Sequence, residues 1–188
     1  MNDYPKSLGN EGVRRERVQL LKSKHILPLV RFVNEIRKER RVTTEVPNFD
    51  PLDGGIFAKL MFVLEAPGAK AVQSGFVSRN NPDETARNFF EINKTVGIPR
   101  NKTITWNIVP WYIGSGKKIR AANQKDIKYG LTYLHRLLAL LPRLKIIVLI
   151  GKKAQKIQHE LQTNHRDIAI LTCPHPIAFA YDAYKEVK

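Results

Sequence analysis

The sequence predicts a three-layer α/β/α sandwich around a central, mainly parallel sheet of four strands. Four apolar runs of strand length recur from residue 58 onward, and segments with helical periodicity separate them. Strands that alternate with helices form parallel sheets covered on both faces. The chain has 188 residues, the size of one domain. Within it we expect a basic helical segment and loop over residues 1–57 and an α/β core over residues 58–188.

Two basic helices are expected between residues 11 and 41. The second has one apolar face and a cationic last turn at residues 37–41, where positive charge complements the helix dipole. The apolar face comprises Ile26, Leu29, Val33 and Ile36. The cationic turn fits a solvated helix end as well as it fits a phosphate contact. Residues 42–57 contain two prolines and two adjacent glycines, which predict a loop.

The first strand of the core is the apolar run at residues 61–64, which ends in the carboxylate of Glu65. A helix start follows, with Asn81 as the cap and Pro82 in the first turn. Glu84 stands three residues after the cap, where its side chain can accept a hydrogen bond from the backbone N–H of Asn81. We expect this helix to bury one apolar face. That face comprises Ala86, Phe89, Phe90 and Val96.

The other strands and helices continue this alternation. The second, third and fourth strands are expected at residues 103–109, 145–151 and 168–172. A long helix before Pro142 has apolar side chains at helical spacing. These are Ile127, Leu131, Leu134, Leu138 and Leu141. A short helix over residues 154–161 precedes the fourth strand.

Charge is the strongest feature of the composition. The chain has 32 lysines and arginines against 17 acidic residues, a net charge of +15, which favours a polyanionic partner. Nucleic acid is the commonest such partner, although an anionic membrane surface or the ribosome would also attract this charge. No apolar run reaches the roughly 18 residues of a membrane span, and no signal sequence opens the chain. We expect a cytoplasmic protein without membrane contact, which is nucleoid-associated and a monomer.

Cysteine and histidine usage indicates a protein without metal or cofactor. Cys173 is the single cysteine, so an intramolecular disulfide and a multi-cysteine zinc or iron–sulfur site are both excluded. The five histidines do not cluster at the spacing of metal ligands.

Polar side chains stand at the ends of three predicted strands. Glu65 ends the first strand, Asn107 lies near the end of the second, and His175 follows the fourth. The carboxyl ends of parallel strands share one edge, where open α/β sheets place their ligands. Each residue has a structural alternative: Glu65 could pair with Lys70, Asn107 could bond a loop, and His175 could form a surface turn. Their coincidence favours a site.

The motifs around these residues resemble those of the uracil-DNA glycosylase superfamily in type, order and spacing. They occupy residues 64–68, 75–77, 106–110 and 175–176, and the likeness covers about residues 58–180. The resemblance implies a monofunctional glycosylase of base excision repair. Such an enzyme flips uracil out of DNA and hydrolyses its N-glycosidic bond, leaving an abasic site and free uracil.

The resemblance also implies roles for individual residues. Glu65 would position the attacking water, Asn107 would read the Watson–Crick edge of the base, and His175 would donate to a carbonyl of the departing base. Phe76 would stack on the base. The base-binding loop would be formed by Ala66, Pro67 and Gly68.

This chain departs from the motifs of its relatives at several positions. Leu64 stands where many relatives have glycine, and no serine follows Pro176. Ala71 stands where related branches carry a bulky residue that excludes the thymine methyl group. Tyr112 and Gln73 are the nearest alternatives for that exclusion. These departures, with the lack of a four-cysteine cluster, indicate a divergent branch.

Contacts to DNA are expected from loops and helix starts that follow the strands. The basic candidates are Arg79, Lys117, Lys118, Arg120 and Lys152. After the histidine motif, Ile177 and Phe179 are apolar, and Phe179 is the candidate wedge that holds the duplex open.

Two other functions remain compatible with the same motifs. One is a protein that binds uracil or abasic DNA without turnover, and the other is a glycosylase for another deaminated base such as hypoxanthine. An unrelated α/β phosphate-binding protein is disfavoured, because the chain has neither a Gly-x-Gly-x-x-Gly nor a Walker motif.

Overall fold

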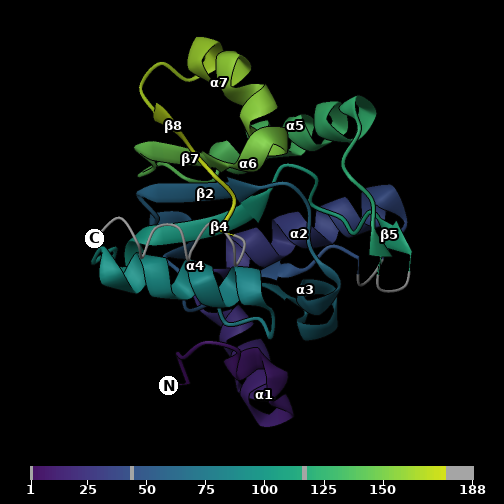
Figure 1. The fold of residues 1–188 in the computed structure, drawn as a ribbon, viewed down its shortest axis with the longest axis vertical. Helices are drawn as coiled ribbons and strands as arrows, with labels where there is room; N and C mark the ends of the chain where they lie inside the picture. The colour runs from purple at the N-terminus through teal and green to yellow at the C-terminus, as the bar shows by residue number, and fades with distance from the viewer. Residues whose placement is uncertain (1, 43–44, 116–117, 177–188) are drawn as a thin grey trace.

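A parallel four-stranded sheet forms the centre of the computed structural model, which describes residues 2–42, 45–115 and 118–176 (Figure 1). Its strands lie in the order β4-β2-β7-β8, and every neighbouring pair is parallel. The strands are β2 (Leu60–Leu64), β4 (Thr103–Asn107), β7 (Ile146–Ile150) and β8 (Ala169–Cys173). The predicted three-layer α/β/α class is thereby confirmed.

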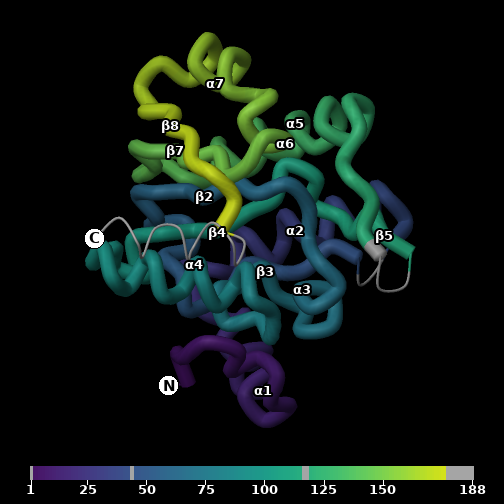
Figure 2. The backbone as a smooth tube through the Cα atoms, in the orientation of Figure 1, coloured from purple at the N-terminus to yellow at the C-terminus, as the bar shows by residue number. Residues whose placement is uncertain are grey.

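Helices cover both faces of this sheet. The helices are α1 (Glu11–Gln19), α2 (Leu27–Arg40), α3 (Ala69–Ser74), α4 (Glu84–Thr95), α5 (Gln124–Leu138), α6 (Gly151–Ala154) and α7 (Gln158–Asn164). α2 and α5 contribute to the main core on the face of the sheet that presents Met61 and Val63. On the opposite face, Phe89 of α4 packs on Phe62. Figure 2 shows α1 at the end of the molecule farthest from α7.

Two short sheets lie beside the central one. β1 (Asn48–Phe49) pairs in parallel with β3 (Phe76–Val77), and β5 (Gly114–Ser115) pairs antiparallel with β6 (Lys118–Ile119). The β1–β3 pair connects the N-terminal segment to the chain that follows β2. The N-terminal helices and the α/β core therefore form one continuous folded unit.

The start and end of α4 differ from the prediction. Its cap is Asp83, whose side chain accepts a hydrogen bond from the Ala86 N–H at 2.9 Å. The side chain of Asn81, the predicted cap, instead accepts a hydrogen bond from the Ser74 hydroxyl at 2.6 Å and donates one to the Phe76 carbonyl at 2.9 Å. Val96, predicted to face inward, is 61% exposed because the helix ends one residue before it.

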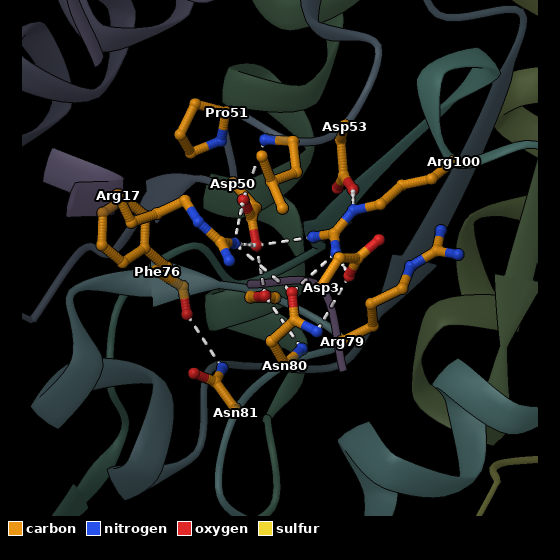
Figure 3. Close-up of polar contacts among 12 residues, drawn as sticks. Asp3, Arg17, Asp50, Pro51, Asp53, Phe76, Arg79, Asn80, Asn81 and Arg100 are labelled. Carbon is orange, nitrogen blue, oxygen red and sulfur yellow. Dashed lines mark hydrogen bonds and ion pairs between the residues drawn. The ribbon is translucent and has the colours of Figure 1, made fainter. Parts of the chain in front are cut away.

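A buried cluster of charges fixes the chain around β3 (Figure 3). Arg17 of α1 donates from Nη1 to both carboxylate oxygens of Asp50, at 2.7 and 2.6 Å. Arg100 donates to Asp50 at 2.6 Å and to Asp53 at 2.8 Å, and Ser78 also donates to Asp50. We call the residues Arg17, Asp50, Asp53 and Arg100 the charge cluster. It holds Ser78 at the start of the segment that forms one wall of the candidate site.

Candidate functional site

A cavity of about 710 Å³ opens at the carboxyl edge of β2 and β4. Its walls come from the turn after β2, from α3, from β3 and the segment after it, from the first turns of α4, from β4, from the end of β6 with the two residues after it, and from the histidine after β8. The lining residues are Leu64–Ala71, Gln73, Val77–Arg79, Asn81, Asp83, Thr85, Ala86, Phe89, Thr105, Asn107, Ile119–Ala121 and His175. A cavity of this size suits a small organic ligand such as a base with part of its sugar.

Glu65 stands at the cavity directly after β2. One of its carboxylate oxygens accepts a hydrogen bond from the Ala122 N–H at 2.6 Å. Lys70, the alternative partner considered from the sequence, contacts Gln73 at 3.3 Å. The backbone of Ala122 thus orients a carboxylate that remains at the edge of the cavity.

Asn107 is the last residue of β4 and is only 3% exposed. Its Cα pairs with that of Leu64 across the β2–β4 ladder. The ladder continues beyond the strands, because Ile108 N–H donates to the Leu64 carbonyl at 2.8 Å and Val109 N–H to the Glu65 carbonyl at 2.9 Å. Sheet hydrogen bonds therefore hold Asn107 and Glu65 next to each other.

His175 reaches the same cavity from the residues after β8. Its Nδ1 is buried and has no hydrogen-bond partner in the described part of the chain. Burial lowers the pKa of His175, while the carboxylates of Glu65 and Asp83 raise it less. Behind the ring lies Gly151, with φ +80°, and a Cβ there would lie 3.5 Å from His175 Cβ. One side of the imidazole is therefore close to the backbone of Gly151, and the lowered pKa favours its neutral form.

The structure thus brings together the three predicted residues Glu65, Asn107 and His175. The predicted loop residues Ala66, Pro67 and Gly68 also line the cavity. Gln73 lines it as well, whereas Tyr112, whose backbone N–H donates to the Glu45 carbonyl at 2.8 Å, is not among the lining residues.

Phe76 does not line the cavity, contrary to the stacking role implied by the resemblance. Its ring is 1% exposed and packs with Leu8 and Val13 of the N-terminal segment. Successive side chains of a strand point to opposite sides, so Val77 faces the cavity instead. The sequence could not distinguish these directions, because both residues of this two-residue strand are apolar.

Phe89 contributes an aromatic ring to the lining of the cavity. It projects from α4 and meets Phe62 edge to face, with ring centroids 4.8 Å apart. The sequence marked Phe89 only as a core residue of an amphipathic helix. Its contact with the cavity follows from the packing of α4 across the end of β4.

Arg79 is buried, which contradicts its predicted place on the DNA-binding surface. The residue is 5% exposed, and Nη2 donates to Thr103 Oγ1 at 2.8 Å. Its guanidinium carbon lies 5.5 Å from the centroid of the Phe89 ring. Burial lowers the pKa of Arg79, although the nearby Asp53 raises it. Arg79 belongs to the wall of the cavity.

The other predicted DNA contacts occupy different positions. Arg120 lies exposed at the mouth of the cavity and donates to both carboxylate oxygens of Asp126, at 2.5 and 3.0 Å. Lys152 is exposed on α6, and Lys118 begins β6. Lys117, Ile177 and Phe179 lie outside the described residues.

Neither a membrane span nor a metal-binding cluster is found in the structure as described. Across residues 2–42, 45–115 and 118–176, no helix combines the length and apolarity that crossing a bilayer requires. The same residues contain no group of three or more histidine, cysteine or acidic side chains placed to hold a metal ion.

Comparison with known proteins gives one family. The model of the family described as the uracil DNA glycosylase superfamily matches residues 52–187, well over half of the chain. The matched span contains Glu65, Asn107 and His175, and it begins after α1 and α2. No curated protein matches the sequence.

Proposed function

The chain belongs to the uracil DNA glycosylase superfamily, and from this premise we propose that it is a monofunctional uracil-DNA glycosylase of base excision repair. Superfamily membership implies a hydrolase that acts on DNA. The finer proposal is that the enzyme extrudes uracil, hydrolyses its N-glycosidic bond and leaves an abasic site. The observation that carries it is the convergence of Glu65, Asn107 and His175 on one cavity.

Asn107 and His175 are suited to bind the two carbonyls of uracil. A side-chain amide has both a donor and an acceptor, so Asn107 can donate to one carbonyl and accept from the adjacent ring N–H. His175, whose pKa is lowered by burial, is neutral at pH 7 and can donate to the other carbonyl. Negative charge develops on the base as it leaves, and a preorganised donor at that point typically stabilises the transition state by about 3 to 4 kcal/mol.

Glu65 is suited to direct water at the sugar. The Ala122 N–H holds one carboxylate oxygen, and a carboxylate has further lone pairs that can accept a hydrogen bond from water. A water held there attacks C1′ as the bond to the base breaks. The negative charge of Glu65 also stabilises the positive charge that develops on the sugar ring.

The apolar walls of the cavity would hold the faces of the base. Val77, Ala86 and Phe89 supply apolar surface from β3 and α4. This assignment replaces Phe76, whose ring packs on the N-terminal segment. Contact with such side chains contributes mainly to binding, whereas the polar groups contribute mainly to rate.

The direct test is release of uracil from an oligonucleotide that contains one uracil, followed by alkaline cleavage of the abasic product. We expect excision by the wild-type protein, and single-turnover rates about 10²- to 10³-fold lower for Asn107→Ala and for His175→Ala. Asn164→Ala and His159→Ala are matched controls on α7, remote from the cavity, and should retain the wild-type rate. Wild-type rates in the two cavity variants would refute their assigned roles.

The same assay distinguishes the neighbouring functions. Oligonucleotides with thymine opposite adenine should release no base, since excision there would damage ordinary DNA. Tight binding of uracil-containing DNA without release would indicate a binding protein. Faster release of hypoxanthine than of uracil would indicate a glycosylase for a different deaminated base.

A further inference from the structure

Besides Nδ1 of His175, two buried polar atoms in the cavity wall lack a partner among the described residues. They are Arg79 Nε and Thr105 Oγ1, and each residue is 5% exposed. Both residues line the cavity that contains Glu65, Asn107 and His175. Buried polar groups in native proteins are nearly always hydrogen-bonded, so each such group calls for an explanation.

The sheet explains why these two residues lie in the same wall. Thr103, Thr105 and Asn107 alternate along β4 and point to the same side, toward α4. Arg79 lies along this row, because its Nη2 donates to Thr103 Oγ1 at 2.8 Å. Figure 3 shows the Arg79 guanidinium directed away from the charge cluster. Phe89 also lies near the guanidinium, with 5.5 Å between its ring centroid and the guanidinium carbon.

The chemistry of the pair selects one kind of ligand atom. An arginine N–H can donate a hydrogen bond and cannot accept one, whereas a threonine hydroxyl can do either. A carbonyl oxygen satisfies both groups. An amino group would place its hydrogens against the N–H of Arg79. A deaminated base has a carbonyl where its undamaged parent has an amino group.

We propose that Arg79 and Thr105 form an inner specificity-determining pair that binds a carbonyl oxygen of the extruded base. The pair favours bases with an oxo group at that position and disfavours those with an amino group. This inference rests on the proposed function, because it assigns the ligand of the same cavity. It adds two residues to the base-reading set of Asn107 and His175.

The test pairs a change in the protein with a change in the base. Single-turnover excision is measured for uracil and for two analogues, 2-pyrimidinone and 4-pyrimidinone, each of which lacks one carbonyl oxygen. Thr105→Val keeps the shape of the side chain and removes the hydroxyl. We expect this variant to excise uracil about tenfold more slowly, with no change for the analogue that lacks the bound oxygen. Thr105→Ser should restore most of the rate on uracil.

Control variants separate this contact from a general disturbance of the cavity. Thr85→Val alters another threonine that lines the cavity and should change all three rates by the same factor. Arg79→Lys keeps the positive charge and moves the donor, and should reproduce the base-dependent loss. It serves as the test if Thr105→Val does not fold, as judged by circular dichroism. Equal losses on all three bases in the variant that folds would overturn the inference, because they would indicate a structural role or a bound water.

A binding measurement keeps this inference distinct from the proposed function. Oligonucleotides with 2′-fluoro sugars resist hydrolysis of the glycosidic bond, so they report contacts to the base without turnover. The wild-type protein should bind the 2′-fluoro uracil oligonucleotide more tightly than the corresponding analogue, and Thr105→Val should reduce this difference, leaving the part that Asn107 and His175 contribute. Absence of uracil release would then refute the proposed function alone, while absence of the binding difference would refute the inference.

Discussion

The protonation of His175 is set by its immediate surroundings. Burial lowers its pKa below the ordinary value of 6.5, and Glu65 and Asp83 oppose that effect. Between the lowered pKa and pH 6.5 the unfolded chain binds more protons at this residue than the native protein does. The contribution of His175 to stability is therefore present above pH 6.5 and is lost as the pH falls through that window. Because its pKa is lowered, His175 stays neutral between that pKa and pH 6.5 and can still donate a hydrogen bond to the base there.

Removing either carboxylate should lower the pKa of His175 further. Glu65→Gln and Asp83→Asn each remove a negative charge while keeping shape, and asparagine still caps a helix well. NMR titration of the His175 ring protons in each variant would measure the shift. Glu160→Gln, a change on α7, is the matched control and should leave the His175 titration unchanged. An unchanged or raised pKa in both cavity variants would contradict the electrostatic account.

Single residues differ in how far the sequence determines their place. Glu65, Asn107 and His175 could be located because the ends of parallel strands share one edge, whatever the details of packing. Phe76 could not, since the direction of a side chain on a two-residue strand depends on what covers each side. Arg79 was expected on the DNA-binding surface because it lies in a segment that follows a strand, but its contacts with Phe89 of α4 and Thr103 of β4 bury it.

At the scale of elements, the charge cluster joins α1 to the segments around β3 and β4. Burial alone would raise the pKa of Asp50, but the charges of Arg100 and Arg17, with hydrogen bonds from Ser78 and Leu52, bring it below 3.8. The stabilisation from ionised Asp50 is accordingly present above pH 3.8 and lost as the pH falls through its native pKa. The arginines depend on this carboxylate, since an unpaired buried charge is costly.

Asp50→Asn should therefore destabilise the protein by about 3 to 5 kcal/mol, because it leaves Arg17 buried without its counter-charge. Urea unfolding followed by circular dichroism would measure the loss. Asp167→Asn makes the same chemical change at an exposed turn and should alter the free energy of unfolding by less than about 0.5 kcal/mol. A loss of under about 1 kcal/mol for Asp50→Asn would show that the cluster does not hold α1 in place.

Elements were easier to predict than their contacts. The strands and the long amphipathic helices have apolar periodicities that leave few alternatives, and the structure has them in the predicted order. The apolar face predicted for the second N-terminal helix packs into the main core, whereas the burial of Arg17 in the first, which is 2% exposed, was not predicted. The partner of Arg17 lies 33 residues away, at Asp50, and sequence spacing alone does not reveal such a pair.

Across the whole molecule, the family match and the folded unit have different limits. The match begins at residue 52, whereas residues of α2 pack into the same core as β2 and β4. Phe76, inside the match, is covered by Leu8 and Val13, outside it. The helices before residue 52 thus complete the core and orient β3, and through it they shape one wall of the cavity.

The net charge of +15 leads to a prediction for the whole molecule. If this charge serves DNA binding, affinity should fall steeply with salt, by about 10³- to 10⁵-fold between 50 and 200 mM for six to ten phosphate contacts. Fluorescence anisotropy with a short duplex at several salt concentrations would give the slope. An affinity that does not change over this range would show that the charge serves another purpose.

Two lysine variants locate the contact surface. Lys152 lies just after β7, at the carboxyl ends of the strands, where the cavity opens. Lys102 lies just before β4, at the amino ends of the strands. Both side chains are exposed. Lys152→Gln should weaken binding and reduce the magnitude of the salt slope by about one, the release of one counterion. Lys102→Gln loses the same charge and should leave the slope unchanged. Equal effects of the two variants would indicate a diffuse electrostatic attraction in place of a defined DNA path across the mouth of the cavity.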